Sequence, residues 1–244
     1  MAWIKQNRFT LLIIGTVLIL LGLITTIILI QKHEQEDERS QYESSISHTP
    51  ILGDKGAEDT ISIYADFQCP YCKEFDLKMM DKLKSRYVDS GKANIRFVNV
   101  GLLGDESLYK SVVSYSLYEH APDKYWTFNQ RLFEEQPKEK QHITKNEDGL
   151  TVKNTKQKAT DNIVEHAKDK NDVNRLLKDI GVSQADIKVI HQDVSNSKSK
   201  AWKNALKDRN LAKKHEIKDV PTIFINGERI KNPNVMESYK DKLG

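Results

Sequence analysis

The two cysteines of this 244-residue chain lie three positions apart, in the sequence Cys69-Pro70-Tyr71-Cys72. Thiol-disulfide exchange needs one cysteine that attacks as a thiolate and a second that resolves the mixed disulfide. A cysteine at the amino end of a helix suits the first role, because free backbone N–H groups and the helix dipole stabilise its charge. Pro70 favours a helix that starts at this point. We therefore expect Cys69 to be the nucleophile and Cys72 the resolving thiol.

Two other uses of such a pair fit less well. A zinc site needs four ligands, and the sequence has neither a second cysteine pair nor histidines at a matching spacing. A purely structural disulfide would close a very short loop and would remove little entropy from the unfolded chain. The pattern therefore indicates redox chemistry, with no metal and no cofactor other than a redox-active Cys69–Cys72 disulfide.

A second candidate element is Val220-Pro221-Thr222, which opens a strand after a long helical stretch. Pro221 could simply end that helix. If the chain returns here beside the cysteines, a cis bond before Pro221 would leave neighbouring backbone groups free to pair with an extended substrate. We expect Val220, Pro221 and Thr222 to form part of the substrate-binding site.

The segments around the cysteines predict a β-α-β unit. Residues 60–67 are β-branched and aromatic, as in a buried strand, and residues 93–100 have the same character. Between them, the apolar spacing from Pro70 towards Tyr87 predicts a helix. The cysteine pair then lies where a strand passes into a helix.

The rest of the chain is predicted to be helical and then to return to strands. Residues 105–217 have helical spacing, except for a polar stretch at 137–159 that we interpret as an exposed loop. Asn226-Gly227 is the strongest hairpin signal, and Asn232-Pro233 favours the start of a last helix. This order predicts an α/β protein: a thioredoxin fold with a helical domain inserted at about 105–217.

The amino-terminal residues predict a membrane anchor. Residues 9–30 are uncharged and apolar, and as a helix they would reach about 33 Å, enough for a hydrocarbon core of roughly 30 Å. Residues 1–8 would be a cytoplasmic tail, because positive flanks prefer that side. Residues 31–55 are polar and predict a linker, so the folded domain should span residues 56–244 and lie outside the cell membrane. A cleaved signal peptide is the alternative.

The charge of the chain is nearly balanced, with 38 basic and 35 acidic residues. No basic cluster is interleaved with aromatic residues, so nothing indicates a nucleic-acid partner.

The stretch DFQCPYCKEF, the helical insertion and VPTIFING occur in an order that resembles the DsbA family of bacterial thiol oxidases. The resemblance is to its membrane-attached, BdbD-like members from Gram-positive bacteria, and it covers about 56–243. It implies that Cys69 is the nucleophile, Cys72 its resolving partner and Pro221 the cis-proline of the substrate groove. It also implies exported proteins with free thiols as substrates and a quinone-linked membrane protein as the reoxidising partner.

One departure from the pattern concerns proton transfer. Many thioredoxin-like proteins carry a buried acid six residues before the first cysteine, where this chain has Ile63. Asp66 is nearer the pair and could relay the proton of Cys72, although a strand-end residue facing water fits that position equally well. Tyr71 lies in the dipeptide that tunes thiolate stability, and Lys73 fits a surface charge.

The preferred interpretation is an extracytoplasmic thiol-disulfide oxidoreductase that introduces disulfides into exported proteins. An enzyme of the same fold that acts as a reductase or isomerase is the closest alternative. A redox-inactive binding or chaperone module is an alternative of another class. A reduction potential separates the first two, and failure to oxidise any dithiol peptide would favour the third.

Overall fold

The computed structural model describes residues 8–136 and 170–244. Within these, the chain divides at Ser45 into an amino-terminal helical unit and a compact domain that runs to Gly244. The two units are described separately below.

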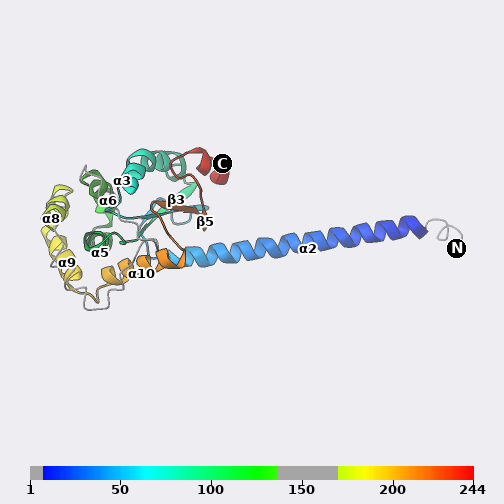
Figure 1. Ribbon diagram of the computed structural model, residues 1–244, viewed down its shortest axis with the longest axis horizontal. Helices are drawn as coiled ribbons and strands as arrows, with labels where there is room; N and C mark the ends of the chain where they lie inside the picture. The colour runs from blue at the N-terminus through cyan, green and yellow to red at the C-terminus, as the bar shows by residue number, and fades with distance from the viewer. Residues whose placement is uncertain (1–7, 137–169) are drawn as a thin grey trace. The chain divides into compact units, whose positions relative to one another are not determined.

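The first unit is the helix α2 (Arg8–Ser45) (Figure 1). From Leu12 to Ile30 its large apolar side chains are exposed, and its most apolar stretch has a mean hydropathy of 2.9. By length and composition, this helix can cross a membrane.

Helix α2 does not end with its apolar part. The predicted linker at 31–55 is helical as far as Ser45, because charged side chains four positions apart pair along the helix. These pairs are Lys32 with Glu36, His33 with Asp37, and Arg39 with Glu43.

The compact domain also begins earlier than the predicted boundary at residue 56. Strand β1 (Ile51–Leu52) pairs antiparallel with β3 (Ala93–Asn99), and Ile46 and Thr49 before it are buried. The sequence prediction missed this edge because the few apolar residues lie in a polar stretch. The predicted linker therefore supplies both the end of a helix and one strand of the sheet.

The sheet has five strands in the order β1-β3-β2-β4-β5. Strands β2 (Asp59–Ala65) and β3 (Ala93–Asn99) are parallel, which confirms the β-α-β unit. Strand β4 (Thr222–Ile225) runs antiparallel to β2, and β5 (Glu228–Arg229) completes the predicted hairpin. Asn226 and Gly227 have φ values of 53° and 88°, as the two-residue turn requires.

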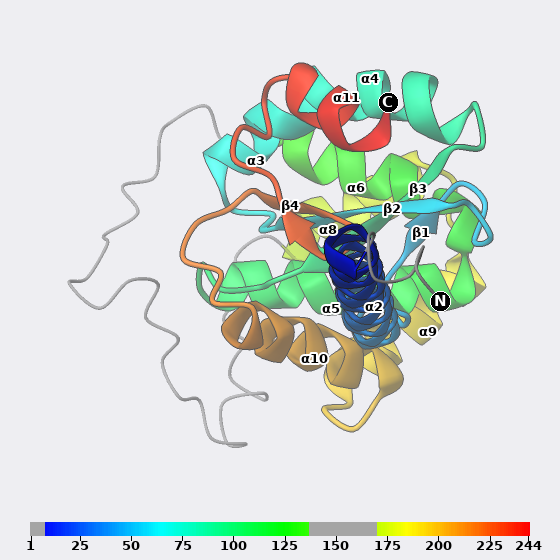
Figure 2. The same cartoon turned by 90° about the vertical axis from the view of Figure 1, so that its right-hand side faces the viewer.

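Helices cover both faces of this sheet (Figure 2). One face carries a continuous helical stretch together with α11 (Glu237–Leu243). The stretch consists of α3 (Pro70–Phe75), η1 (Asp76–Met80), α4 (Asp81–Leu83) and η2 (Lys84–Val88), of which η1 and η2 are π-helical. The other face carries α5 (Asp105–His120) and α10 (Lys200–Lys214). All seven residues of β3 are buried as a result.

The described helices between β3 and β4 occupy the place predicted for the helical insertion. Besides α5 and α10, they are η3 (Pro122–Lys124), α6 (Tyr125–Glu134), α8 (Lys170–Asp179) and α9 (Gln184–Ser195). The hydroxyls of Ser183 and Ser199 accept hydrogen bonds at the starts of α9 and α10. The thioredoxin-type order of elements is therefore confirmed.

Two predictions need comment. The last helix starts at Glu237 and not at Asn232-Pro233, which lie in a turn before it. The predicted loop at 137–159, with its polar residues Asn146, Glu147 and Asp148, lies outside the described residues.

Candidate active site

Cys69 and Cys72 lie where the loop after β2 passes into α3. Cys69 is the N-cap residue and Pro70 occupies the first helical turn, as the sequence predicts. The Cys69 carbonyl accepts a hydrogen bond from Lys73 N at 3.1 Å, which closes that turn. Both cysteines are free thiols in this structure, which therefore represents the reduced state.

The two thiols differ in their acidity. A hydrogen bond from the Cys72 side chain lowers the pKa of Cys69; burial opposes this, and the backbone N–H groups of Cys72 and Tyr71 support it. Burial raises the pKa of Cys72 well above its ordinary value, and the neighbouring Cys69 raises it further. Cys69 therefore ionises first, while Cys72 keeps its proton.

Cys69, the thiol expected to attack, is more buried than a reactive thiol is expected to be. Cys69 and Cys72 are each only 1% exposed, whereas Tyr71 between them is 64% exposed. The Cys69 thiol donates a hydrogen bond to the Val220 carbonyl at 3.4 Å, because the turn that carries Val220 lies directly against it. In the reduced form, the Val220 carbonyl therefore occupies one side of Cys69 Sγ.

The Val220-Pro221 peptide bond is cis, as predicted. The Thr222 hydroxyl donates to the carbonyl of Asp219 at 2.7 Å, and Arg229 binds the Asp219 carboxylate at 2.6 Å. Thr222 is buried, so its side chain stabilises the turn instead of facing a substrate. The backbone of Val220 is the part of this element that lies beside the thiols.

Asp66 is fully buried, so the alternative that it faces water is wrong. Its carboxylate accepts hydrogen bonds from four groups: the loop amides Gln68 N, Leu102 N and Leu103 N, and the Ser107 hydroxyl in the first turns of α5. Its own N–H points to Cys72 Sγ at 3.5 Å. The carboxylate thus anchors these loops, and its role as a proton relay stays a prediction.

Ile63, at the position of the absent acid, is buried in β2. A different acid, Asp76, is only 8% exposed, and burial followed by the charges of Glu134 and Asp81 raises its pKa to about 7. Asp76 follows Cys72 by one helical turn, a spacing that places both on one side of the helix. That spacing is the signal by which the sequence analysis could have found it.

Asp76 also lines a cleft of about 400 Å³ between the active-site helical stretch and α6. Its apolar wall includes Leu52, Leu77, Met80 and Trp126. The Trp126 indole N–H donates to the Ile51 carbonyl at 3.2 Å and so closes the side formed by β1. Solvent can therefore approach Asp76 although its own exposure is low.

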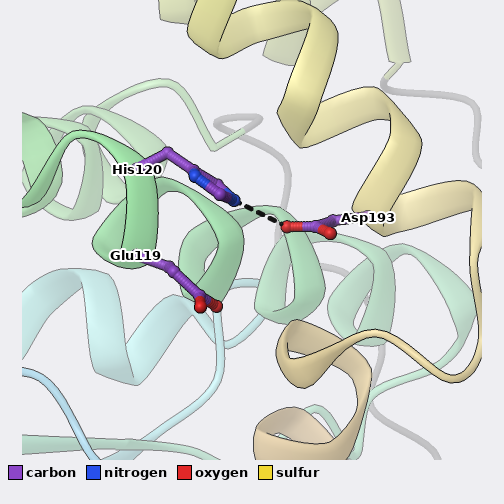
Figure 3. A group of neighbouring side chains, drawn as sticks. All are labelled: Glu119, His120 and Asp193. Carbon is purple, nitrogen blue, oxygen red and sulfur yellow. Dashed lines mark hydrogen bonds and ion pairs between the residues drawn. The ribbon is translucent and has the colours of Figure 1, made fainter.

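One group of described side chains has the composition of a metal site, namely Glu119, His120 and Asp193 (Figure 3). His120 and the Ser116 hydroxyl already contact the same oxygen of Asp193, at 2.9 and 2.8 Å. The ammonium of Lys200 lies 3.1 Å from Glu119. These contacts provide hydrogen-bond partners for both carboxylates and join α5 to α9 and α10, so the group is explained by helix packing.

A family described as thioredoxin matches residues 45–243 of this chain. Disulfide bond formation protein D of Bacillus subtilis is 28% identical over 213 residues, which cover 87% of this chain and 83% of that protein. A probable disulfide bond formation protein D of Bacillus anthracis is 26% identical over 218 residues, covering 89% of this chain and 86% of that one.

Solved structures agree with this assignment. The crystal structure of oxidised BdbD from Bacillus subtilis superposes with a TM-score of 0.61 and 25% identity, and covers 81% of this chain and 92% of that one. The thiol-disulfide exchange protein alpha-DsbA2 of Wolbachia pipientis has the same TM-score at 16% identity, covering 88% and 98% of the two chains, and shares the fold. Since the family match runs from the first residues of the compact domain to its last helix, the chain belongs to the thioredoxin family and is a DsbA-like thiol-disulfide oxidoreductase.

Proposed function

We propose that this protein is a membrane-anchored oxidase that passes its Cys69–Cys72 disulfide to exported proteins with free thiols. The opposite pKa shifts of the two cysteines carry this proposal. A thiolate that is stabilised at Cys69 favours the reduced enzyme over the disulfide, and an enzyme whose reduced form is favoured oxidises its substrates.

The transfer takes two exchanges. A substrate thiolate attacks Cys69 Sγ of the disulfide, the Cys69–Cys72 bond breaks, and Cys72 leaves and takes up a proton, in keeping with its raised pKa. A second substrate thiolate then attacks the substrate sulfur of the mixed disulfide and releases Cys69 as a thiolate. The substrate loses two electrons and gains a disulfide, and the enzyme is left as the dithiol.

The backbone of Val220 and Pro221 holds the extended substrate beside Cys69 in this proposal. The contact between the Val220 carbonyl and the Cys69 thiol supports it, because a substrate chain that pairs with this edge places its own sulfur nearby. No cofactor other than the disulfide takes part in the exchange.

The reduced enzyme must pass two electrons on, and a quinone-linked membrane protein is the proposed acceptor. In this proposal, the catalytic domain lies outside the cell membrane and residues 1–8 lie in the cytoplasm. Two features support this arrangement: the basic residues before the apolar stretch and acidic ones after it, and relatives named for disulfide bond formation.

The reduction potential tests the direction of exchange. The full-length protein in detergent is equilibrated with glutathione buffers of graded ratio, and the oxidised fraction is read by thiol labelling. We expect the standard potential of the Cys69–Cys72 pair to be more oxidising than that of the glutathione couple. We also expect the disulfide form of the protein to oxidise a dithiol peptide. A more reducing potential would favour a reductase, and a failure to oxidise the peptide would favour a binding module.

Single cysteine variants test the assigned roles in the same assay. Cys69→Ser should abolish exchange, whereas Cys72→Ser should accumulate a mixed disulfide between Cys69 and glutathione, because no second enzyme thiol is left to displace the glutathione. The double variant Cys69→Ser/Cys72→Ser is the blank. Identical behaviour of the two single variants would contradict the assignment.

A further inference from the structure

Gln136, just beyond the end of α6, lies against the loop that carries Cys69. Its side chain is buried, with 6% of the residue exposed. The amide Nε2 donates to the Phe67 carbonyl at 2.7 Å and lies 3.4 Å from the Cys69 carbonyl. One side chain thus binds the backbone on both sides of Gln68, immediately before the active-site helix.

Lys73 makes the reciprocal contact. Its ammonium donates to the carbonyls of Glu134 and Gln136 at 2.9 and 3.0 Å. These carbonyls lie at the end of α6, where helix carbonyls lack partners and the dipole favours a cation. The active-site helix therefore caps α6, while Gln136 beyond α6 binds the loop before the active-site helix. We call this pair of contacts the Gln136–Lys73 clasp.

Aromatic packing fixes the two elements beneath the clasp. The ring centroids of Phe67 and Phe133 are 5.2 Å apart, and both rings pack on Phe97 of β3, at 5.7 and 6.2 Å. Since Phe67 precedes Cys69 and Phe133 precedes Gln136, a shift of either backbone would disturb this packing. The clasp accordingly joins two segments that have little freedom to move apart.

We propose that Gln136 is a positioning residue that holds the Cys69 backbone in the geometry that stabilises its thiolate. The thiolate depends on hydrogen bonds from the side chain of Cys72 and from the N–H groups of Cys72 and Tyr71. Such bonds to a charged acceptor weaken steeply when donor and acceptor move apart, whereas the neutral thiol loses little. The aromatic packing holds Phe67, but the Cys69 backbone two residues later is held by the Gln136 amide. Without that amide, the Cys69 backbone gains freedom, and the charged form of the thiol loses more stabilisation than the neutral one. The inference concerns thiolate stability and is independent of the direction in which the enzyme runs.

The test uses Gln136→Met, which keeps the length of the side chain and removes its donors. Gln130→Met is the matched control, because Gln130 is an exposed glutamine on α6 whose amide contacts Glu134. For the reduced full-length proteins in detergent, the rate of Cys69 alkylation by iodoacetamide is followed against pH by mass spectrometry. The free energy of unfolding is measured in parallel.

In Gln136→Met, we expect the midpoint of the alkylation profile to move to higher pH. Below the midpoint, the alkylation rate should fall at least about threefold, because the thiolate loses stabilisation equal to the net value of one hydrogen bond. Gln130→Met should keep the profile of the unmodified protein. A lower unfolding free energy with an unchanged profile would mean that Gln136 serves stability alone, and the proposal would fall.

Lys73→Met tests the other half of the clasp. If Gln136→Met does not fold, this variant tests the proposal in its place. Its control is Lys78→Met, which removes a positive charge from the same helical stretch, where Lys78 pairs with Glu74 in solvent. The alkylation midpoint should rise more in Lys73→Met than in Lys78→Met. Equal shifts of the midpoint in the two variants would mean that the loss of a positive charge alone causes the effect, and would overturn the proposal.

Discussion

The hydrogen bond between the two thiols lowers the pKa of Cys69 and raises that of Cys72, whereas burial raises the pKa of both. Both are 1% exposed, yet Cys69 receives hydrogen bonds that favour its thiolate, whereas Cys72 is the donor of one of them. A donor must keep its proton, so the bond that lowers the pKa of Cys69 also raises that of Cys72. The difference in acidity between the two thiols thus follows from their positions in α3, with Cys69 at the N-cap and Cys72 in the first turn.

Asp66 should influence the thiols through its charge. Burial is the main cause of the raised pKa of Cys72, and the Asp66 carboxylate adds to it; the same charge partly opposes the hydrogen bonds that lower the pKa of Cys69. Asp66→Asn should therefore move the Cys69 alkylation profile to lower pH. It should also lower the free energy of unfolding by about 1–3 kcal/mol, because buried N–H groups lose their acceptor.

Asp89→Asn is the control for this prediction, since Asp89 is an exposed acid paired with Lys84. If Asp66 is instead a proton relay, Asp66→Asn should leave the alkylation profile in place and slow the step in which Cys72 is released or attacks. Single-turnover measurements of mixed-disulfide decay distinguish the two outcomes.

Asp76 should make stability depend on pH in the neutral range. Its pKa is raised from 3.8 to about 7 in the folded protein, chiefly by burial. Well below the ordinary value of 3.8 the carboxyl is protonated in both the folded and the unfolded state, so its burial as a charged group costs no stability. As the pH rises from about 4 to about 7, the unfolded chain ionises first and folding loses stability.

Asp76→Asn should therefore stabilise the protein at pH 8, by up to about 4 kcal/mol, and have little effect at pH 4. Unfolding by denaturant at the two pH values measures this difference. Asp123→Asn, which removes an exposed acid, should show no such pH dependence. A stabilisation of equal size at both pH values would contradict the assigned pKa.

At the scale of elements, local patterns predicted most of the architecture. The strands at 59–65 and 93–99, the helix start at Pro70 and the hairpin at Asn226-Gly227 are set by residues adjacent in sequence, so they could be recognised. Strand β1 could not, because two residues of strand become visible only through their pairing with β3.

The candidate site shows the same division. The cysteines and the cis-proline could be predicted from the short motifs that contain them, because each motif stands next to a predicted strand or helix that indicates its role. Gln136 and Asp66 act through contacts to backbone groups far along the chain, and such contacts leave no mark on the local sequence. Lys73 was expected on the surface for that reason, but its ammonium is bound by the carbonyls at the end of α6.

A buried network joins four segments of the compact domain around Asp208. This carboxylate is fully buried on α10 and accepts hydrogen bonds from His48 Nε2, Tyr115 Oη and Asn99 N, at 2.8, 2.5 and 2.7 Å. His48 precedes β1, Tyr115 belongs to α5, and Asn99 ends β3. The network therefore ties the start of the domain to the helices on one face of the sheet.

Tyr115→Phe should lower the free energy of unfolding by about 1.5–3 kcal/mol, the range for a hydrogen bond to a charged group. The alkylation profile of Cys69 should not change, because the hydrogen bond of Tyr115 is to Asp208 and not to the loop that carries the cysteines. Denaturant unfolding and the alkylation assay measure the two effects. Tyr71→Phe, at an exposed ring, serves as the stability control; an equal loss in both variants would argue against the network.

At the scale of the whole molecule, the charges on either side of the apolar stretch of α2 predict which side of a membrane the compact domain should occupy. Lys5 and Arg8 precede the apolar stretch, and acidic residues follow it. Positively charged flanks are retained in the cytoplasm, so the thiols should face the opposite side. Disulfides persist in that oxidising environment, which is where an oxidase of this kind has substrates.

Reporter cysteines test this orientation, since the oxidation state of the native pair would otherwise affect the labelling. In the Cys69→Ser/Cys72→Ser background, Asn234→Cys places a thiol on the exposed surface of the compact domain, and Lys5→Cys places one before the apolar stretch. A membrane-impermeant maleimide should label Asn234→Cys in intact cells, and Lys5→Cys only after lysis. The labelled protein should remain in the membrane fraction at full length. The reverse labelling pattern would refute the orientation, and a shorter soluble product would mean that the amino-terminal segment is cleaved as a signal peptide.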